Sequence, residues 1–424
     1  MPAKNIYFIG INGGSLNGIA QILLARGFNV TGSDVVETKI TKKLRKLGIK
    51  INIGQKGSNI SAEIDEVVIS SAVMNGPGAA EIEAAKKLKI PVYKRTVWWK
   101  RIMGEAKRAV AVAGSHGKTS TTAMIGYVLA EAGLDPTVMI GGFVPDFKGT
   151  VRVGSKDVVV LEADEYDKAF HASRPTISVI TNIDFDHPDT YKNLDLYIKG
   201  FRKFAKLSKS RNGKIIAYGK DKNIRLALKQ LKTDIKYYSE DNLVPGIEVS
   251  IPGVHMQLNA QAAFHVCHSL GVEKKLIKKA LKNFQGVGRR FEFMMDYNGM
   301  RIYDDFAHHP TEIRAVIKAA QKKHQGKIAV IFQPHQRVRT KQFISDFASA
   351  LDLADKAAVM PIYEVVGREE DIDIQSDDIA DLSVKISLIK EPKIKEFVDQ
   401  LKDYKALLVV GAGDINEKVK KALE

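Results

Sequence analysis

The sequence predicts an α/β protein built from three domains, and three observations lead to this prediction. Short apolar runs alternate with helix-like stretches along the whole chain, which is typical of parallel sheets covered by helices. Two glycine-rich turns each follow an apolar run and open a helix-like stretch, as phosphate-binding turns do. The 424 residues are enough for two or three domains of about 100–200 residues each.

The alternation divides into three blocks, which we predict to be domains. Residues 1–103 carry apolar runs such as IYFIG and EVVISSAV between helix-like runs such as GIAQILLARG, a Rossmann-like pattern. Residues 104–288 open with RAVAVAG, a glycine turn and TSTTAMIGYVLAEAG, as a central P-loop ATPase-type α/β domain does. Residues 289–424 alternate RIYDDF, KIAVIFQ and ALLVVGAG with the expected helices PTEIRAVIKAAQKKH and TKQFISDFASALDLA, which again predicts a Rossmann-like domain.

The composition excludes several classes of protein. Hydrophobic residues make up 45% and charged residues 27%, which is ordinary for a globular protein. The single cysteine, Cys267, excludes an intramolecular disulfide and a multi-cysteine metal site, and its apolar surroundings indicate a packing role. No apolar run reaches the roughly 18–20 residues of a membrane helix, and the first residues lead directly into an apolar run rather than a signal peptide. We therefore expect a cytoplasmic location.

The formal net charge of +16 would suit nucleic acid, a membrane surface or an anionic small molecule as a partner. The lysines, however, are scattered through helix-like segments, and no basic tail or aromatic-interleaved strand accompanies them. This distribution favours a solvated, lysine-rich surface. We expect no nucleic-acid and no membrane partner, and a monomer or weak homodimer.

The second glycine turn, AVAGSHGKTSTT, is the strongest local pattern. Glycines let backbone N–H groups approach phosphate oxygens, and the following helix N-terminus favours negative charge. Lys118 would reach the β- and γ-phosphates of ATP, and Thr119 offers a hydroxyl to Mg²⁺. The longer P-loop form has a glycine where this chain has Val112, so the turn is the shorter form. The candidate ATP-binding residues here are Gly114, Ser115, His116, Gly117, Lys118, Thr119 and Ser120.

Acidic residues follow two later apolar runs, DVVVLEA and ISVITNI. The carboxyl ends of parallel strands meet at one edge of a sheet, where open α/β sheets bind ligands. Mg²⁺ prefers carboxylate oxygens, phosphates and water. These positions therefore predict a metal-ATP site, and they are Glu162, Asp164, Glu165, Asp167, Asn182, Asp184, Asp186, His187 and Asp189.

The first glycine turn, IGINGGSLNGIA, admits more than one interpretation. It follows an apolar run like a dinucleotide-binding turn, yet such a turn has a glycine where this chain has Asn12. A nicotinamide-dependent oxidoreductase would use this turn and would have no use for Lys118. A regulatory or nucleic-acid-dependent ATPase would instead hydrolyse ATP in response to DNA or RNA.

Six motifs carry a resemblance to a known family. AGSHGKTST, EADE, TNIDFDH, LNAQAA, GVGRRFE and DDFAHHPTEI resemble, in this order, the Mur ligases of bacterial cell-wall synthesis, and the resemblance covers essentially the whole chain. It implies a UDP-sugar domain, a central ATPase and a C-terminal domain for the incoming amino acid or peptide. It also implies ATP-dependent amide formation through an acyl phosphate, with ATP and Mg²⁺ as cofactors.

The resemblance implies roles for individual residues. Thr119, Glu162 and His187 match the metal-binding positions, and Lys118 matches the phosphate-binding lysine. Asn259 matches the asparagine that meets adenine, while Arg290 and Asp305 match two further nucleotide contacts. The implied UDP-sugar residues are Gly10, Asn12, Gly13, Gly14, Ser15, Asp34, Ser70 and Ser71.

Two branches of the family fit the third block. FQPH, followed by Arg339, and GAGDI favour the members that add L-alanine to UDP-N-acetylmuramate. The rival members, which recycle cell wall, attach a tripeptide to the same UDP-sugar; LEADEYDKAF and DDFAHHPT resemble them as closely. Phe306 stands where the alanine-adding members have tyrosine. The implied amino-acid-binding residues are Phe306, His335, Arg337 and Arg339.

Three departures from the family pattern accompany these motifs. Gln336 stands where the substrate loop has an arginine, and Met256 stands where the first of two asparagines precedes LNA. A short stretch, SEDNLVPGIEVS, replaces a longer β-rich segment, which predicts a trimmed central domain. None of these departures touches Lys118, Thr119, Glu162 or His187.

His308 and His309 precede a helix-like run in DDFAHHPTEI. Either histidine could position substrate or accept the amine proton, and we name both as candidate catalytic residues beside Lys118, Glu162 and His187. Either could equally cap the helix and bond the backbone. The general base stays open between these alternatives.

Overall fold

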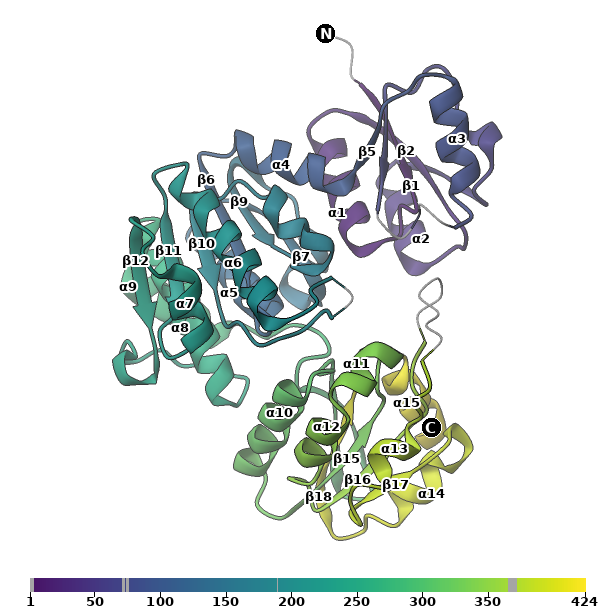
Figure 1. The fold of residues 1–424 in the computed structure, drawn as a ribbon, viewed down its shortest axis with the longest axis vertical. Helices are drawn as coiled ribbons and strands as arrows, with labels where there is room; N and C mark the ends of the chain where they lie inside the picture. Colours follow the sequence, from purple (N-terminus) through teal and green to yellow (C-terminus); the bar gives the residue numbers. More distant parts are fainter. Residues whose placement is uncertain (1–3, 71–72, 74–75, 189, 365–371) are drawn as a thin grey trace. The chain divides into compact units, whose positions relative to one another are not determined.

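The chain forms two compact units with parallel sheets (Figure 1). The computed structural model describes residues 4–70, 73, 76–188, 190–364 and 372–424. The first unit comprises Met1–Asp184, Asp195–Val244 and Gln261–Leu281. The second comprises Phe185–Leu194, Pro245–Ala260 and Lys282–Glu424.

The first sheet of the first unit is entirely parallel, in the order β3-β2-β1-β4-β5. Its strands are β1 (Asn5–Ile9), β2 (Asn29–Asp34), β3 (Lys50–Ile53), β4 (Glu66–Ile69) and β5 (Val92–Lys94). Its helices are α1 (Gly14–Ala25), α2 (Lys39–Lys46) and α3 (Ala79–Lys87). The central strands β1 and β4 are apolar and buried because helices cover both faces of a parallel sheet. The carboxyl ends of β2, β1 and β4 therefore lie side by side.

The second sheet has the order β12-β11-β10-β6-β9-β7-β8, and β8 alone runs antiparallel to its neighbour. Its strands are β6 (Arg108–Ala113), β7 (Pro136–Val144), β8 (Gly149–Arg152), β9 (Ser155–Glu162), β10 (Ile177–Ile180), β11 (Lys214–Tyr218) and β12 (Asp234–Tyr238). The helices of this part of the chain are α4 (Arg95–Glu105), α5 (Lys118–Glu131), α6 (Leu194–Lys209), α7 (Lys222–Leu228), α8 (Val254–Ser269) and α9 (Lys274–Asn283). Between Tyr238 and Val254 the chain forms no strand, in line with the trimmed central domain that the sequence predicts.

The third sheet lies in the second unit, in the order β13-β14-β18-β15-β16-β17 with β13 antiparallel. Its strands are β13 (Glu292–Tyr297), β14 (Met300–Asp305), β15 (Lys327–Phe332), β16 (Lys356–Val359), β17 (Ile386–Leu388) and β18 (Tyr404–Val410). Its helices are α10 (Pro310–Lys323), α11 (Arg337–Gln342), α12 (Ile344–Leu351), α13 (Asp377–Ala380), α14 (Ile394–Asp399) and α15 (Ile415–Leu423).

Two hydrophobic cores lie on opposite faces of the third sheet. Alternate residues of β15 point to opposite faces, so Val330 packs with Ile313 of α10 while Ile331 packs with Phe397 of α14 and Val419 of α15. The three α/β sheets confirm the predicted fold class.

Some elements differ from the sequence-based expectation. The helix expected over TKQFISDFASALDLA is two helices, because Phe343 has φ −119° and interrupts the run between α11 and α12. The β7–β8 hairpin and α4 lie in stretches where the sequence patterns above predict no element. Cys267 is fully buried, which confirms its packing role. Among the described residues, no helix is both long and apolar enough to cross a bilayer.

Candidate active site

The phosphate loop joins β6 to α5 and requires glycine at two positions. Gly114 has φ +143° and Gly117 has φ +79°, in the region that L-residues with side chains avoid. A Cβ at Gly114 would lie only 1.9 Å from Thr181 Oγ1, so β10 packs directly against the loop. The His116 backbone N–H also donates to Asn182 Oδ1 at 2.9 Å. The end of β10 therefore holds the loop in shape.

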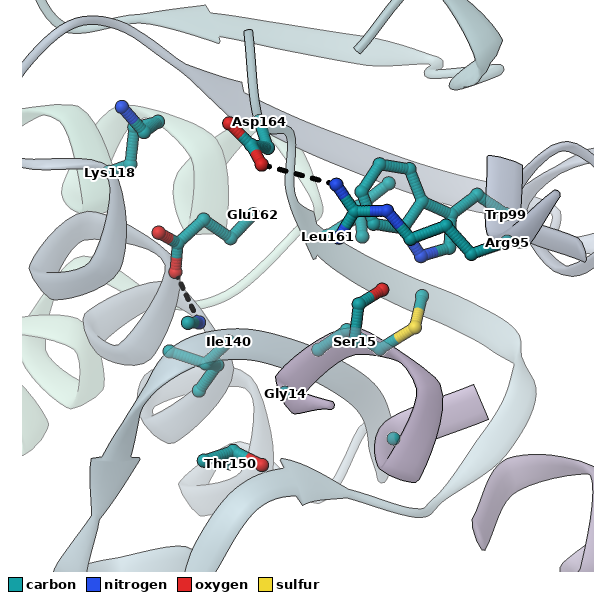
Figure 2. Close-up of a pocket in the computed structure, with 13 residues that line it drawn as sticks. Gly14, Ser15, Arg95, Trp99, Lys118, Ile140, Thr150, Leu161, Glu162 and Asp164 are labelled. Atoms are coloured by element: carbon teal, nitrogen blue, oxygen red, sulfur yellow. Dashed lines mark hydrogen bonds and ion pairs between the residues drawn. The ribbon is translucent and has the colours of Figure 1, made fainter. Parts of the chain in front are cut away.

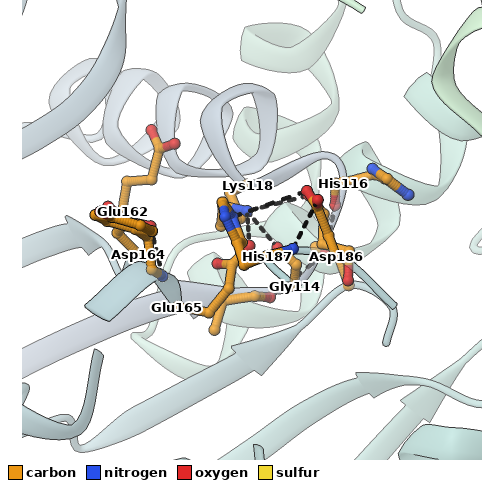
Figure 3. Close-up of polar contacts among 12 residues, drawn as sticks. Gly114, His116, Lys118, Glu162, Asp164, Glu165, Asp186 and His187 are labelled. Carbon is orange, nitrogen blue, oxygen red and sulfur yellow. Dashed lines mark hydrogen bonds and ion pairs between the residues drawn. The ribbon is translucent and has the colours of Figure 1, made fainter. Parts of the chain in front are cut away.

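Lys118 begins α5 and folds back over this loop (Figure 3). Its Nζ donates to Gly114 O at 2.5 Å, to Ser115 O at 3.1 Å and to Glu165 Oε1 at 2.8 Å. Burial disfavours the charged form of Lys118, but the carboxylates of Glu165, Asp164 and Glu162 together outweigh burial and raise the lysine pKa above its usual value. Lys118 is therefore cationic at neutral pH, within a loop whose backbone suits phosphate.

Thr119 and Glu162 lie together beside Lys118. Thr119 Oγ1 donates to Glu162 Oε1 at 2.8 Å, and the Gly141 backbone N–H donates to Glu162 Oε2 at 2.6 Å. Burial raises the pKa of Glu162 despite these donors. A buried carboxylate with a raised pKa favours a nearby cation, and a hydroxyl with a carboxylate is the hard oxygen set that Mg²⁺ prefers. These residues fit the predicted metal site.

A cavity of about 260 Å³ opens beside this cluster (Figure 2). Arg95 from α4 borders it and donates to Asp164 Oδ2 at 3.3 Å. Residues of both glycine turns line this cavity, because Lys118 and the first turn of α1 both contribute to its wall. The lining residues are Gly14, Ser15, Gly18, Arg95, Trp99, Lys118, Met139, Ile140, Gly141, Thr150, Leu161, Glu162 and Asp164.

In the first glycine turn, Asn12 stands where a dinucleotide-binding turn has a glycine, and its hydrogen bonds hold the turn in shape. The Asn12 backbone N–H donates to Asp34 Oδ2 at 2.8 Å, and its side chain donates to Val36 O and accepts from Thr41 Oγ1. Asn12 and Asp34 are thus joined to each other at the carboxyl ends of β1 and β2. Gly10 has φ +77°, as a tight turn after β1 requires.

The remaining predicted UDP-sugar residues lie along the same edge of the first sheet. Gly13 precedes α1 as its N-cap, and Gly14 and Ser15 form its first turn. The Ser15 hydroxyl is buried and has no hydrogen-bond partner within the described chain. Ser70 directly follows β4, whereas Ser71 lies outside the described residues.

In the second unit, Asp305 closes β14 and ties down the chain around it. Its Oδ2 accepts from the Phe291 backbone N–H and its Oδ1 from the Ala307 backbone N–H, both at 2.8 Å. Burial raises the pKa of Asp305 to about 6. Arg290 lies 3.7 Å from the Glu312 carboxylate. The structure thus gives Asp305 a structural role. The nucleotide contact of Asp305 stays a prediction.

The two histidines of this segment have different surroundings. His309 caps α10, since its Nδ1 accepts from the Thr311 backbone N–H at 3.3 Å. The His308 ring lies with its Nδ1 3.1 Å from Phe306 O, and burial lowers the pKa of His308 to about 3. His308 is therefore neutral at neutral pH. The capping interpretation holds for His309, and His308 is the better candidate for a catalytic role.

Arg339 makes a buried ion pair rather than pointing to solvent. Its guanidinium bonds both carboxylate oxygens of Asp186 at 3.1–3.3 Å, and the exposed fractions of Arg339 and Asp186 are 4% and 3%. Burial opposes ionisation of Asp186, but Arg339 together with His187, His308 and His309 outweighs burial and holds the carboxyl pKa well below its usual range. His187 follows directly with φ +54°, and its Nε2 lies 3.8 Å from Asp186 Oδ2.

The other predicted amino-acid-binding residues contact further residues of the second unit. The His335 ring stacks on Tyr363 with centroids 5.6 Å apart. Arg337 bonds Glu364 at 2.6 Å and Ile374 O at 2.7 Å. Phe306 lies 5.5 Å from the guanidinium of Arg290.

Asn259 is a buried residue of α8. It contacts Met256, the residue that departs from the family pattern. Its Nδ2 lies 3.8 Å from Met256 Sδ, and the exposed fractions are 6% and 2%. The predicted adenine contact of Asn259 stays a prediction.

The structure groups the predicted residues into two sets. Lys118, Thr119 and Glu162 meet in the first unit, while His187 belongs to the second. Sequence reasoning missed Arg95, Trp99 and Gly141 of the cavity, because α4 and the β7–β8 hairpin carry no motif and join the site only through folding.

Comparisons with known proteins agree with the motif order. Residues 5–107 match the Mur ligase family catalytic domain, residues 112–244 the Mur ligase middle domain, and residues 289–415 the Mur ligase glutamate ligase domain. The chain is 38% identical to the UDP-N-acetylmuramate–L-alanine ligase of Caldicellulosiruptor bescii, over 97% of this chain and 96% of that protein. It is also 38% identical to the ligase of the same name from Caldanaerobacter subterraneus subsp. tengcongensis, over 99% of this chain and 97% of that one.

Solved structures extend the likeness to the fold. The UDP-N-acetylmuramate-alanine ligase of Thermotoga maritima superposes with a TM-score of 0.79 at 29% identity, covering 99% of this chain and 98% of that one. A murein peptide ligase of Psychrobacter arcticus superposes with a TM-score of 0.72 at 23% identity, over 99% of this chain and 98% of that one, which shows a shared fold alone. With relatives this similar along nearly its whole length, the chain belongs to the Mur ligase family.

Proposed function

We propose that this protein is an ATP-dependent ligase that joins the amino group of L-alanine to the lactyl carboxylate of UDP-N-acetylmuramate. The observation that carries this proposal is the single cavity lined by both Ser15 of the first glycine turn and Lys118 of the second. A nucleotide-sugar held at the first turn would present its carboxylate to a phosphate held at the second. The full-length alanine-ligase relatives support the same reaction.

The chemistry follows from the charges of the reactants. A carboxylate oxygen attacks the γ-phosphorus of ATP, the bond to the bridging oxygen breaks, and ADP leaves. The amine nitrogen then attacks the acyl carbon, the bond to the phosphate oxygen breaks, and inorganic phosphate leaves while the amine loses a proton. Lys118 would stabilise the negative charge that develops between the two anions in the first step.

Thr119 and Glu162 would hold Mg²⁺ in this proposal, with His187 added by the family resemblance. The ion supplies charge neutralisation at the phosphates when it is bound. Glu162 would act as an oxygen ligand of the ion. Its two carboxylate oxygens accept hydrogen bonds from Thr119 Oγ1 and the Gly141 N–H, which hold the carboxylate in place.

The other residue roles stay proposals of the same kind. ATP would contact Gly114–Ser120, Asn259, Arg290 and Asp305, and the UDP-sugar would contact the edge of the first sheet. L-Alanine would meet Phe306, His335 and the arginines of α11. Domain limits of 1–103, 104–288 and 289–424 are supported by the three sheets. A cytoplasmic monomer or weak homodimer without nucleic-acid or membrane partners stays a prediction.

A coupled assay of ADP release tests the proposal. Release is expected only when UDP-N-acetylmuramate and L-alanine are both present, and omission of either should remove it. Other amino acids and the murein tripeptide are tested side by side. Preference for the tripeptide would move the protein to the recycling branch, and ADP release without any UDP-sugar would overturn the ligase assignment.

A further inference from the structure

Two adjacent tryptophans of α4, Trp98 and Trp99, each bury an indole N–H that has no hydrogen-bond partner among the described residues. Trp98 is 5% exposed and Trp99 is 3% exposed. Neither Nε1 has a hydrogen-bond partner within the described part of the chain. Leaving a buried donor unpaired costs about 1–3 kcal/mol, so each such group in a folded protein calls for a reason.

The surroundings of the two rings differ. Trp98 packs edge-to-face against Phe28, with centroids 5.6 Å apart, and does not line the cavity. Trp99 lines the cavity beside Lys118 and Glu162. Consecutive residues of a helix point about 100° apart, which explains why only one of the two rings reaches it.

Trp99 is held in a defined orientation at the cavity wall (Figure 2). The Arg95 guanidinium lies 4.8 Å from the centre of its ring and is itself bonded to Asp164 at 3.3 Å. Arg95 thus covers one face of the ring, and the indole Nε1–H is a buried donor that has no partner among the described residues. Ser15, whose buried hydroxyl is also unpaired, contributes a second polar group to the same cavity.

The size and lining of the cavity define what it takes. About 260 Å³ is below the roughly 300–1,000 Å³ of sites that enclose whole drug-sized ligands, so one part of a larger substrate fits. Met139, Ile140 and Leu161 add an apolar wall suited to short methyl groups. The first turn of α1 and Lys118 both line the cavity. In an extended nucleotide-sugar, the group between a diphosphate and a reacting carboxylate is the sugar ring.

We infer that Trp99 is a specificity-determining residue that binds the N-acetylated sugar of the substrate, with its Nε1–H donating to a sugar or acetamido oxygen. The inference rests on the proposed function for the identity of the sugar. Ser15 contributes the second hydrogen bond, and the apolar wall takes the methyl groups. Trp98 provides a matched control, because it is equally buried and equally unpaired but lies outside the cavity.

Tryptophan fluorescence tests this inference directly, since the chain contains only these two tryptophans. In Trp98→Phe the emission comes from Trp99 alone, and in Trp99→Phe it comes from Trp98 alone. Titration with UDP-N-acetylmuramate, without ATP, should change the emission of Trp98→Phe and leave that of Trp99→Phe nearly constant. No change in Trp98→Phe at saturating UDP-sugar would overturn the inference.

Steady-state kinetics provide the second measurement. Trp99→Phe should raise KM for UDP-N-acetylmuramate about 3- to 10-fold, the effect of one lost hydrogen bond, with KM for ATP unchanged. Trp98→Phe should stay within about twofold of the wild type, and circular dichroism checks that both variants fold. Ser15→Ala should raise the same KM and serves if Trp99→Phe does not fold. An equal KM in the two tryptophan variants would contradict the inference.

The two proposals fail in distinguishable ways. If the wild type releases no ADP with L-alanine but Trp98→Phe fluorescence responds to the UDP-sugar, the sugar site stands and the reaction assignment falls. If ADP release depends on both substrates but the fluorescence does not respond, the reaction stands and the role of Trp99 falls.

Discussion

At the scale of single residues, Lys118 is the group on which the proposed reaction depends most. Lys118→Ala removes a cation that the Glu165 carboxylate keeps charged. ADP release is expected to fall at least about 100-fold, as when a transition-state donor is removed. Lys107→Ala is the control, because Lys107 is 77% exposed in an ion pair with Asp157 and should keep full activity. Turnover by Lys118→Ala near the wild-type rate would remove the assignment of the phosphate loop.

The Asp186–Arg339 pair is a second residue-scale feature, and it concerns stability. Asp186→Asn leaves the Arg339 charge buried without its partner, so the free energy of unfolding should fall by about 3–5 kcal/mol. Denaturant unfolding measures this change. Asp296→Asn in the exposed pair with Arg301 should cost at most about 1 kcal/mol. Equal losses in both variants would show that the buried pair has no special weight.

The pH dependence of this pair has a defined sign. The folded-state pKa of Asp186 is lowered, so its contribution to stability is present above the unfolded value of about 3.9 and is lost as the pH falls below it.

At the scale of elements, the phosphate loop depends on where its glycines sit. Gly114→Ala places a Cβ against Thr181 Oγ1, so the loop must move and ADP release should fall at least about 10-fold. Gly133→Ala is the matched control, because Gly133 also has positive φ but has no atom within 4 Å of the new Cβ. That variant should lose about 1–2 kcal/mol of stability and keep its activity. An equal loss of activity in both variants would contradict this prediction.

The end of β14 gives an element-scale prediction about pH. Asp305 has a pKa raised to about 6 by burial, above the unfolded value of about 3.9. Its protonated form is favoured in the folded state, so the contribution of Asp305 to stability is greatest below about pH 4 and is lost as the pH rises through about 6. The loss amounts to about 3 kcal/mol. Asp305→Asn, which cannot titrate, should lack this fall in unfolding experiments between pH 4 and pH 7; an unchanged profile would contradict it.

Several elements could be predicted and others could not. The strands β6, β9 and β10 are continuous apolar runs, and their pattern is visible without any partner. The break at Phe343 could not be seen, because the residue is apolar and fits the helical period. It contacts the ring of His309, which comes from a distant segment. In the β7–β8 hairpin, Gly141, Gly142 and Gly149 interrupt the strand-forming residues, and β7 pairs with β9.

At the scale of the whole molecule, the charge of +16 still requires a test. A dispersed lysine-rich surface predicts that DNA or RNA leaves the rate of ADP release unchanged at about 0.15 M salt. Both should be tried with and without UDP-N-acetylmuramate. Stimulation by nucleic acid alone would favour the nucleic-acid-dependent ATPase and count against the ligase.

The sequence by itself determined the α/β class, the order of the motifs, the family and the phosphate loop with Lys118. Each of these is written in contiguous residues, where spacing and residue type carry the chemistry. Only the tertiary structure decided that Asn12 braces the first turn, that His309 caps a helix and that Arg339 pairs with Asp186. It also decided that Trp99 and Ser15 line the same cavity as Lys118. These contacts join segments far apart in the chain, and only packing brings them together.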